Sequence, residues 1–171
     1  MVLAAVGCGD NIDDPFVGLV RVSGVSPFAP SCKGNQSGIN FAGMEVEPSV
    51  AVDPTNAAHL VGVWQQDRWS NGGANGIRTA VTYDGGATWA LTTPRFGRCG
   101  GGDADNGGGY DRASDPWVTF AADGTAFLSV LAFDATTPRN AMLASRSTDG
   151  GASWSDPTVL IADDDPDVFN D

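Results

Sequence analysis

The sequence predicts an all-β protein made of repeated four-stranded antiparallel units, a β-propeller. The composition is that of a many-turned β protein, with Gly 23 and Pro 10 among 171 residues. No helical periodicity persists over three turns. An eight-residue stretch, TYDGGATW at 82–89, returns as STDGGASW at 147–154. An internal repeat of this length is typical of folds in which each unit buries a face against its neighbour.

The repeat extends well beyond these eight residues. Residues 47–66 align with residues 115–134 at an offset of 68, and the two short stretches follow at an offset of 65. This alignment places Glu47-Pro48 on Asp115-Pro116, Val50 on Val118, Leu60 on Leu128 and Val63 on Leu131. The sequence therefore predicts one supersecondary unit used twice, at about 47–92 and 115–161.

Each unit is expected to hold four short strands. The predicted strands are about 49–53, 59–65, 77–83 and 87–92 in the first unit, and 117–121, 125–133, 140–147 and 152–161 in the second. The hairpins between them are closed by Asp53-Pro54-Thr55-Asn56, Asp84-Gly85-Gly86, Asp123-Gly124 and Asp149-Gly150-Gly151. Glycine accepts positive φ in such turns, and the aspartate accepts backbone N–H groups. Four antiparallel strands per repeat form a propeller blade.

The last hairpin of each unit resembles a known motif. Thr82-x-Asp84-x-Gly86-x-Thr88-Trp89 and Ser147-x-Asp149-x-Gly151-x-Ser153-Trp154 are similar to the Asp box, S/T-x-D-x-G-x-T/S-W, of sialidases and related propellers. The resemblance covers about residues 45–161 and implies a propeller of six blades, in which the box is a hairpin remote from the active site. Because only two units are complete, we expect an N-terminal fragment of a longer protein, whose missing C-terminal blades are its partners. Residues 16–22, FVGLVRV, are expected to form a strand of such a partner blade.

Charge and the N-terminus narrow the possible partners and the compartment. The net charge is −12 with one lysine, which excludes a nucleic-acid partner and disfavours an acidic membrane surface. Ala5-Val6-Gly7 before Cys8 resembles a bacterial lipoprotein cleavage box, so residues 1–15 are either a signal remnant and linker with a lipid anchor at Cys8 or a frayed apolar terminus. An exported, cell-envelope or secreted protein follows from the first reading. Cys32 and Cys99 are then a disulfide pair or two unpaired thiols.

The candidate site residues come from the places that reach one mouth of a propeller. These places are the entry to each innermost strand, the segment 65–76 and the glycine-rich bridge 98–114. Acidic, basic and aromatic side chains converge there, which is typical of a binding pocket. The candidate catalytic residues are Arg68, Asp67, Arg112, Asp115 and Glu47.

The resemblance to sialidases supports only part of this set. Sialidases bind the sugar carboxylate with three arginines, protonate the leaving group with an aspartate, and attack with a tyrosine that a glutamate activates. The ending VWQQDR is similar to the family segment that ends in Glu-x-Arg, which implies a substrate-side role for Arg68. Glu47-Pro48-Ser49 stands where the family has Arg-Ile-Pro, and no carboxylate stands near 75–77, where the acid/base aspartate is expected. Ordinary sialidase catalysis is therefore not assigned to these residues.

Alternatives stay open for the acids and for the arginines. Glu47 and Asp115 are either two carboxylates flanking a glycosidic bond or a structural acid that the repeat uses twice. Arg68 and Arg112 either bind substrate or pair with a nearby acid such as Asp67 or Asp115.

No cofactor or metal is predicted. DDDPD at 163–167 lacks the order of a calcium loop, the lone His59 has no second ligand, and GGGDADNGGG has no following lysine. The sequence predicts a sialidase-like propeller that acts on or binds a glycan or polysaccharide; its catalytic form is an exo-sialidase or other glycoside hydrolase in the full-length protein. The alternative is a non-catalytic module that binds a protein or polysaccharide at the cell envelope.

Overall fold

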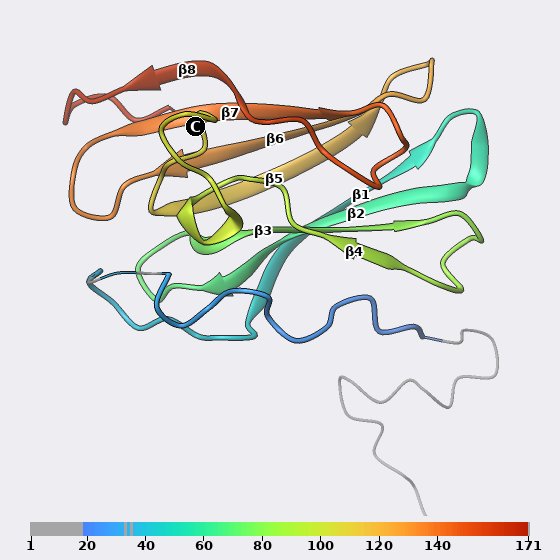
Figure 1. The fold of residues 1–171 in the computed structure, drawn as a ribbon, viewed down its shortest axis with the longest axis horizontal. Coiled ribbons are helices and arrows are strands. Elements are labelled where there is room, and N and C mark those ends of the chain that lie inside the picture. The colour runs from blue at the N-terminus through green and yellow to red at the C-terminus, as the bar shows by residue number, and fades with distance from the viewer. Residues whose placement is uncertain (1–18, 33, 35, 171) are drawn as a thin grey trace, which may run out of the picture.

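The computed structural model describes residues 19–32, 34 and 36–170, and within them the chain forms eight antiparallel β-strands (Figure 1). The first four are β1 Glu45–Asp53, β2 Asn56–Arg68, β3 Ala74–Thr82 and β4 Ala90–Thr92. After a turn of 3-10 helix, η2 Arg98–Gly100, come β5 Arg112–Phe120, β6 Ala126–Phe133, β7 Asn140–Ser147 and β8 Thr158–Asp163. Strands pair in chain order within each set, and Ala74 of β3 opposes Ala113 of β5 between the sets. The all-β class is confirmed, and the strands of this one sheet fall into two sets of four, β1–β4 and β5–β8.

The observed strands differ from the predicted ones mainly in the last hairpin of each unit. β4 begins at Ala90 rather than 87, and β8 begins at Thr158 rather than 152. Residues 152–157 instead form a loop, which a hydrogen bond from Ser155 N to Arg146 O, 2.8 Å, closes against β7. This loop gives Trp154 room to leave its own unit.

The strand expected at 16–22 is not observed over residues 19–22, which lie outside the strands. Residues 16–18, and with them Cys8 and the proposed signal remnant, lie outside the described residues. In the part of the chain that the structure describes, no helix has the length and apolar character that a bilayer crossing requires.

The strand registers correct the alignment of the two copies. In the first unit Leu60 opposes Thr82 of the Asp box, and in the second Ala126 opposes Ser147. The second strands therefore align two residues away from the sequence alignment, so Leu60 corresponds to Ala126 and not to Leu128. Likewise, Val63 corresponds to Ser129 and not to Leu131. A shift of two residues keeps every side chain on its predicted face of the sheet.

Both Asp boxes form the predicted turn. The Asp84 carboxylate accepts hydrogen bonds from Thr88 N at 2.9 Å and Thr88 Oγ1 at 2.6 Å, and Thr82 Oγ1 accepts one from Gly86 N at 3.0 Å. Thr82 Oγ1 also donates to Asp84 Oδ1, 2.7 Å.

The second box repeats these bonds with serines. Asp149 accepts from Ser153 N at 2.9 Å and from Ser147 Oγ at 2.6 Å, and Gly151 N donates to Ser147 Oγ at 2.7 Å. The box is thus a hairpin closed by its own side chains.

The disulfide pair is confirmed. Cys32 and Cys99 are bonded, with Cα atoms 5.1 Å apart and a sequence separation of 67. The bond joins the segment before β1 to η2, at the opposite end of the units from the Asp boxes. The alternative of two unpaired thiols is wrong.

The core lies between the two units. The first unit contributes Val61, Val63, Ile77 and Val81, and the second contributes Val118, Leu128, Val130 and Leu143. By the corrected alignment Val61 corresponds to Phe127, which lies on the opposite face of β6 from Leu128. The first unit therefore contributes one face of its sheet to the contact, and the second unit contributes the opposite face. This face-to-back packing is how repeats stack in a series.

Small residues and tryptophan make this contact close. A Cβ on Gly151 would lie 2.5 Å from Val61 Cγ2, so a larger residue there would push the units apart. Trp154 packs against the core and donates from Nε1 to Thr79 Oγ1 on β3, 3.1 Å. The second Asp box is consequently a contact between units as well as a turn.

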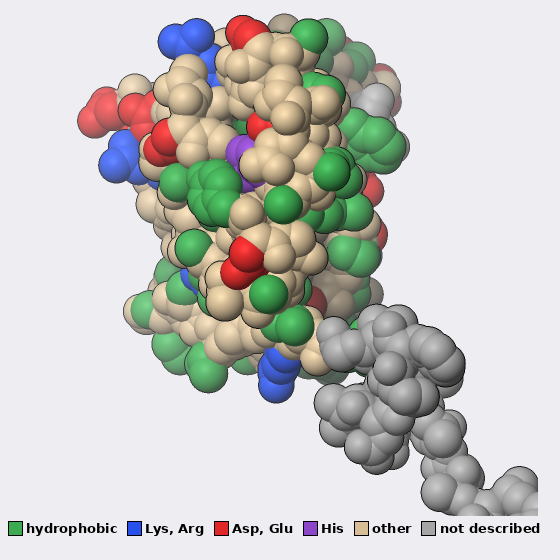
Figure 2. All heavy atoms as spheres, turned by 90° about the vertical axis from the view of Figure 1, so that its right-hand side faces the viewer, with side chains coloured by type: hydrophobic (Ala, Val, Ile, Leu, Met, Phe, Trp, Pro, Cys, Tyr) green, Lys and Arg blue, Asp and Glu red, His purple; other side chains and the backbone are tan. Residues whose placement is uncertain are grey.

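His59 ties the two hairpin ends together. The residue is only 5% exposed, and its ring lies between Asp53 of its own unit and Gly150 of the second box. Nδ1 is 2.9 Å from Asp53 Oδ2 and Nε2 is 2.6 Å from Gly150 O. Tyr83 stacks on the ring with centroids 4.5 Å apart and donates to Asp149 O, 3.0 Å. Figure 2 views this end, where the chain's one histidine, in purple, is nearly covered. The lone histidine thus has a structural role at the unit contact.

The pKa values of the two Asp-box aspartates predict how the stability of the fold depends on pH. Hydrogen bonds from Thr88 and Thr82 lower the pKa of Asp84 to about 2. Burial of Asp149 would raise the pKa of its carboxyl, but the bonds from Ser147 and Ser153 outweigh it and lower the pKa to about 2. Between the ordinary pKa of 3.8 and the lowered value of about 2, the unfolded chain therefore binds more protons than the folded chain. The contribution of these two aspartates to the free energy of unfolding is full above pH 4 and falls towards pH 2.

We expect the melting temperature to drop over that window, and Asp149→Asn to lower the melting temperature at pH 7 while making its fall below pH 4 shallower. Circular dichroism between pH 2 and pH 7 measures both effects, with Asp164→Asn in the exposed C-terminal segment as the control. A wild-type melting temperature that is constant between pH 4 and pH 2 would contradict the account.

Candidate functional site

The candidate site residues lie at one end of the two units. There β1 begins, β2 ends, and β3 and β5 begin, at the opposite end from both Asp boxes. Arg68 opposes Ala74 and Ala74 opposes Ala113, so the ends of β2, β3 and β5 lie side by side. β1 also contacts β5, although the two strands are not paired. The topology therefore brings the two pre-proline acids to the same place.

Glu47 and Asp115 hold the same strained conformation. Their φ angles are 53° and 49°, in the left-handed region that side chains rarely adopt, and each precedes a proline. Both lie where the register shifts, between Val46 and Ser49 in β1 and between Ser114 and Trp117 in β5. A β-bulge of this kind re-aims the side chain at the bulge, and such strain costs about 1–3 kcal/mol per residue. Both copies of the repeat thus have the same strained β-bulge, which turns both carboxylates to the same side.

The two acids line one open groove. Its lining residues are Glu47, Pro48, Ser49, Val50, Asp115, Pro116 and Trp117. Trp117 is 64% exposed, whereas its chain neighbours Pro116 and Val118 are buried. A large indole held in solvent beside two carboxylates is the most distinctive feature of this mouth.

Gln65 connects Glu47 to two further side chains of the mouth. Its side chain is fully buried, and its Nε2 donates to Glu47 Oε2 and, at 3.0 Å, to Ser114 Oγ. Its Oε1 accepts from Arg68 Nη1, 3.0 Å. Arg68 therefore contributes to the mouth through Gln65, and it forms no ion pair with Asp67 among the described residues. Sequence reasoning missed Gln65 and Ser114, although two adjacent amides in an otherwise apolar strand are a usable signal.

Asp67 is a structural centre of the segment before β1. Its side chain is buried and its φ is 65°. Oδ2 accepts from Ser26 Oγ at 2.7 Å, and Oδ1 accepts from Gly43 N at 2.8 Å and Gln66 Nε2 at 3.0 Å. The structure thus places this carboxylate among bonds that hold the chain before β1 onto the end of β2, not in the groove.

Arg112 is buried away from the groove. Its side chain is 1% exposed, and the guanidinium lies 4.6 Å from the Trp69 ring centroid. It donates to Gln36 Oε1, Asn71 Oδ1, Gly72 O and Ser37 O, at 2.6 to 3.0 Å. Burial lowers the pKa of this guanidinium, and the nearby Asp111 opposes that shift. The alternative that Arg112 pairs with Asp67 or Asp115 is not observed among the described residues, because its four donor contacts go to neutral oxygens.

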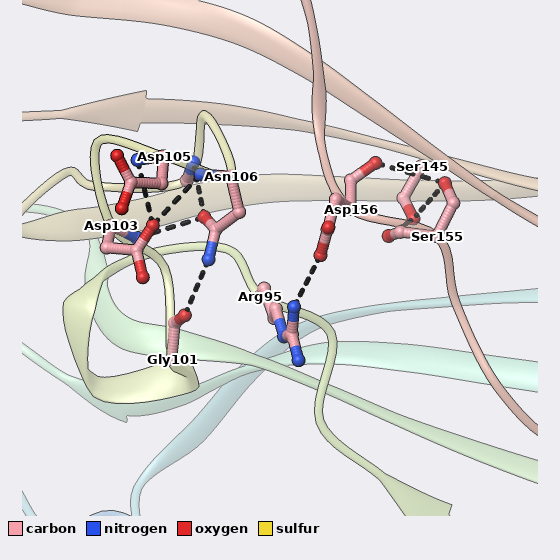
Figure 3. A network of polar contacts seen from close by, with 9 residues as sticks. Arg95, Gly101, Asp103, Asp105, Asn106, Ser145, Ser155 and Asp156 are labelled. Carbon is pink, nitrogen blue, oxygen red and sulfur yellow. Dashed lines mark hydrogen bonds and ion pairs between the residues drawn. The ribbon is translucent and has the colours of Figure 1, made fainter.

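The glycine-rich bridge is closed by its own side chains (Figure 3). Asp103 Oδ1 accepts from Asp105 N and Asn106 N, both at 2.9 Å, and Asn106 Nδ2 donates to Gly101 O at 3.0 Å. Arg95 reaches across to Asp156 of the second unit, 2.7 Å. No group of three metal-ligating side chains occurs among the described residues. The bridge leads from η2 to β5, and these bonds within it hold its turns.

Comparison with known proteins gives a likeness only at the level of solved structures. No family model matches the chain, and no curated protein matches it. The chain is similar to an α-L-arabinofuranosidase from Fusarium graminearum, with a TM-score of 0.49 and 16% identity over 69% of this chain and 32% of that one. It is also similar to a GH43 endo-arabinanase from Bacillus licheniformis, with a TM-score of 0.43 and 17% identity over 75% and 41%. The chain thus spans less than half of either protein. At these values the likeness assigns no activity, and the sialidase resemblance remains a prediction from the two boxes.

Arg112 is expected to matter for stability. Arg112→Met leaves several buried oxygens without a donor, so we expect the unfolding free energy to fall by about 3 kcal/mol. Urea denaturation measures this loss, and Arg146→Met on the exposed face of β7 is the matched control, with a change within about 0.5 kcal/mol. An Arg112→Met variant as stable as the wild type would show that the network is not needed.

Proposed function

We propose that the chain is part of a β-propeller whose mouth, at Glu47 and Asp115, binds or hydrolyses glycans. The observation that carries the proposal is the shared groove, in which two repeat-equivalent carboxylates lie beside an exposed indole. Carboxylates accept hydrogen bonds from sugar hydroxyls, and a pair of them is what most glycoside hydrolases use as acid and base or nucleophile.

The propeller part of the proposal rests on the face-to-back packing. The face of the second unit that corresponds to the packed face of the first carries Phe127, Met142 and Arg146, of which Phe127 and Arg146 are exposed. A further unit with its own Asp-box tryptophan fits this face, as Trp154 fits the first unit. The predicted C-terminal blades are the partner we propose for it.

A sialidase activity is the weaker form of the proposal. Recognition of a sugar carboxylate needs arginines at the mouth, because the guanidinium fork binds carboxylate with two bonds. Arg112 is buried and Arg68 already donates to Gln65. Glu47 occupies the position of the first family arginine. Sialic-acid cleavage would therefore depend on arginines supplied by the blades that we expect beyond this chain.

A non-catalytic binding module is the second candidate. Its support is the equivalence of Glu47 and Asp115, since positions that a repeat retains usually serve architecture. The bond from Gln65 to Glu47 also engages one of the carboxylates in the ground state. In this form the groove still binds a polysaccharide, and no bond is cleaved.

We also propose that the protein is exported, and the disulfide supports this proposal. A bridge such as Cys32–Cys99 persists in oxidising compartments, and the bacterial cell envelope is one of them. We retain the lipid anchor at Cys8 as part of this proposal.

Substitution of the acids tests the proposed site. In the full-length protein, Glu47→Gln and Asp115→Asn should each lower glycan binding or turnover by about tenfold or more, while the melting temperature changes by a few degrees. A panel of fluorogenic glycosides measures turnover, and calorimetric titration measures binding. Loss of turnover with binding retained supports the enzyme, and binding without turnover in the wild type supports the module. A protein that neither binds nor cleaves any glycan would overturn both.

A further inference from the structure

The His59 ring meets one hydrogen-bond acceptor in each unit. Nδ1 is 2.9 Å from Asp53 Oδ2, and Nε2 is 2.6 Å from Gly150 O. A carbonyl oxygen and an ionised carboxylate both accept hydrogen bonds and have no hydrogen to donate. The two contacts are hydrogen bonds at the same time only when both ring nitrogens carry a proton, so the ring is then a charged imidazolium. We propose that this ring makes the contact between the units pH-sensitive. The charged ring holds the tip of the second Asp box, Asp149-Gly150, on the first unit, and the neutral ring releases it.

Other donors keep Asp53 ionised. Its Oδ1 accepts from Thr55 N and from Thr55 Oγ1, both at 2.7 Å. These two bonds, with a smaller contribution from His59, lower the pKa of Asp53. A protonated carboxyl that donates to a neutral ring is therefore disfavoured at neutral pH. The proton that completes both contacts belongs to the ring.

The groups that face the ring from the neighbouring elements are aromatic or acidic. Tyr83, which follows β3, stacks on the ring, and Phe120 of β5 meets it edge to face with centroids 5.1 Å apart. Burial, and then the charge of Asp149, raise the pKa of Tyr83, so its hydroxyl stays protonated and donates to Asp149 O. Asp149 itself, with a pKa of about 2, is ionised at neutral pH.

The turn between β5 and β6 brings one further acid. A Cβ on Gly124 would lie 3.7 Å from Asp53 Oδ2, and bonds from Thr125 lower the pKa of Asp123 in the same turn. Among the described residues no arginine forms an ion pair with Asp53, Asp123 or Asp149. The imidazolium is thus the cation that pairs with the acids at this end of the contact.

Loss of one ring proton leaves one of the two contacts without a hydrogen. The charged Asp53 is the stronger acceptor, so the remaining proton stays on Nδ1. Nε2 then presents a lone pair to the Gly150 carbonyl oxygen 2.6 Å away, which is repulsive. The tip has little room to adjust in place, because a Cβ on Gly150 would lie only 2.6 Å from ring Cε1. The tip therefore moves away from the first unit, while Trp154 and its bond to Thr79 keep the core contact.

The contact between the tip and the first unit weakens as the pH rises. An ordinary histidine has a pKa of about 6.5. The stability that the doubly bonded ring contributes is therefore full below about pH 6.5 and is lost as the pH rises and the folded ring gives up its proton. This window lies above that of the two Asp-box aspartates, and the effect has the opposite sign.

Amide hydrogen exchange in the full-length protein tests the proposal. The amides of Gly151 and Ser153 donate to side chains of their own box. After correction for the intrinsic exchange rate, we expect their protection to fall by about tenfold between about pH 5.5 and about pH 8.5. The amides of Gly86 and Thr88 make the same bonds in the first box, whose carbonyls no ring nitrogen contacts. Their protection is the matched control and should change by less than about twofold.

Asp53→Asn is the most discriminating variant. Its amide oxygen can keep the bonds from Thr55, and its amide nitrogen can donate to Nδ1 of a neutral ring, whose Nε2 proton then bonds Gly150 O. We expect this variant to reverse the pH dependence, with protection of the second box retained at about pH 8.5 and lower at about pH 5.5. His59→Gln has no imidazolium, so protection of the second box should be low at both pH values.

Nitrogen-15 NMR of the ring reports its charge directly, and the signal is the one that His59→Gln lacks. An imidazolium whose loss coincides with the loss of protection supports the proposal. A ring that is neutral at about pH 5.5, equal wild-type protection at both pH values, or an Asp53→Asn variant that keeps the wild-type direction of change would each overturn it. The exchange measurement on the wild type needs no variant, so it decides the question even if a variant does not fold. None of these outcomes depends on whether the protein binds a glycan.

Discussion

Trp154 leaves its own hairpin and packs on the β3 face of the first unit, where its indole N–H donates to Thr79 Oγ1. Around it, Gly151 lies against Val61 and Gly150 O meets the His59 ring. This contact buries the apolar face of the first unit, which a four-stranded sheet could not bury by itself. The face-to-back arrangement of the two units depends on it.

The groove is a consequence of that packing. When equivalent units stack in the same direction, equivalent positions of their first strands come to one end, and the bulges at Glu47 and Asp115 then meet there. The strain at these residues is repaid elsewhere, by the core between the units and by the Gln65 bonds. Backbone strain is thus concentrated at the end opposite the Asp boxes, where Glu47, Asp67 and Asp115 have positive φ.

The sequence predicted local features well because short-range chemistry decides them. The Asp-Gly-Gly turns and the alternation along the strands needed only spacing and residue type. The pairing of Cys32 with Cys99 was one of two alternatives that the sequence left open, and the structure decides it. The sequence could not give the two-residue shift between the copies, since a shift by two leaves the apolar pattern unchanged. The burial of Arg112 also escaped, because its acceptors at 36–37 and 71–72 are far away in sequence. Charged residues in glycine-rich loops look alike in sequence whether they face a ligand or the protein.

The measurement that tests the face-to-back contact most directly compares the two Asp-box tryptophans. Trp89 and Trp154 hold the same place in the same turn, but Trp89 Nε1 donates within its own hairpin, to Gly86 O at 3.0 Å, whereas Trp154 bonds the other unit. Urea denaturation of the two alanine variants should show a loss of about 3 kcal/mol or more for Trp154→Ala and about 1 kcal/mol for Trp89→Ala. Equal losses would contradict the account, because they would mean that the boxes act only as turns.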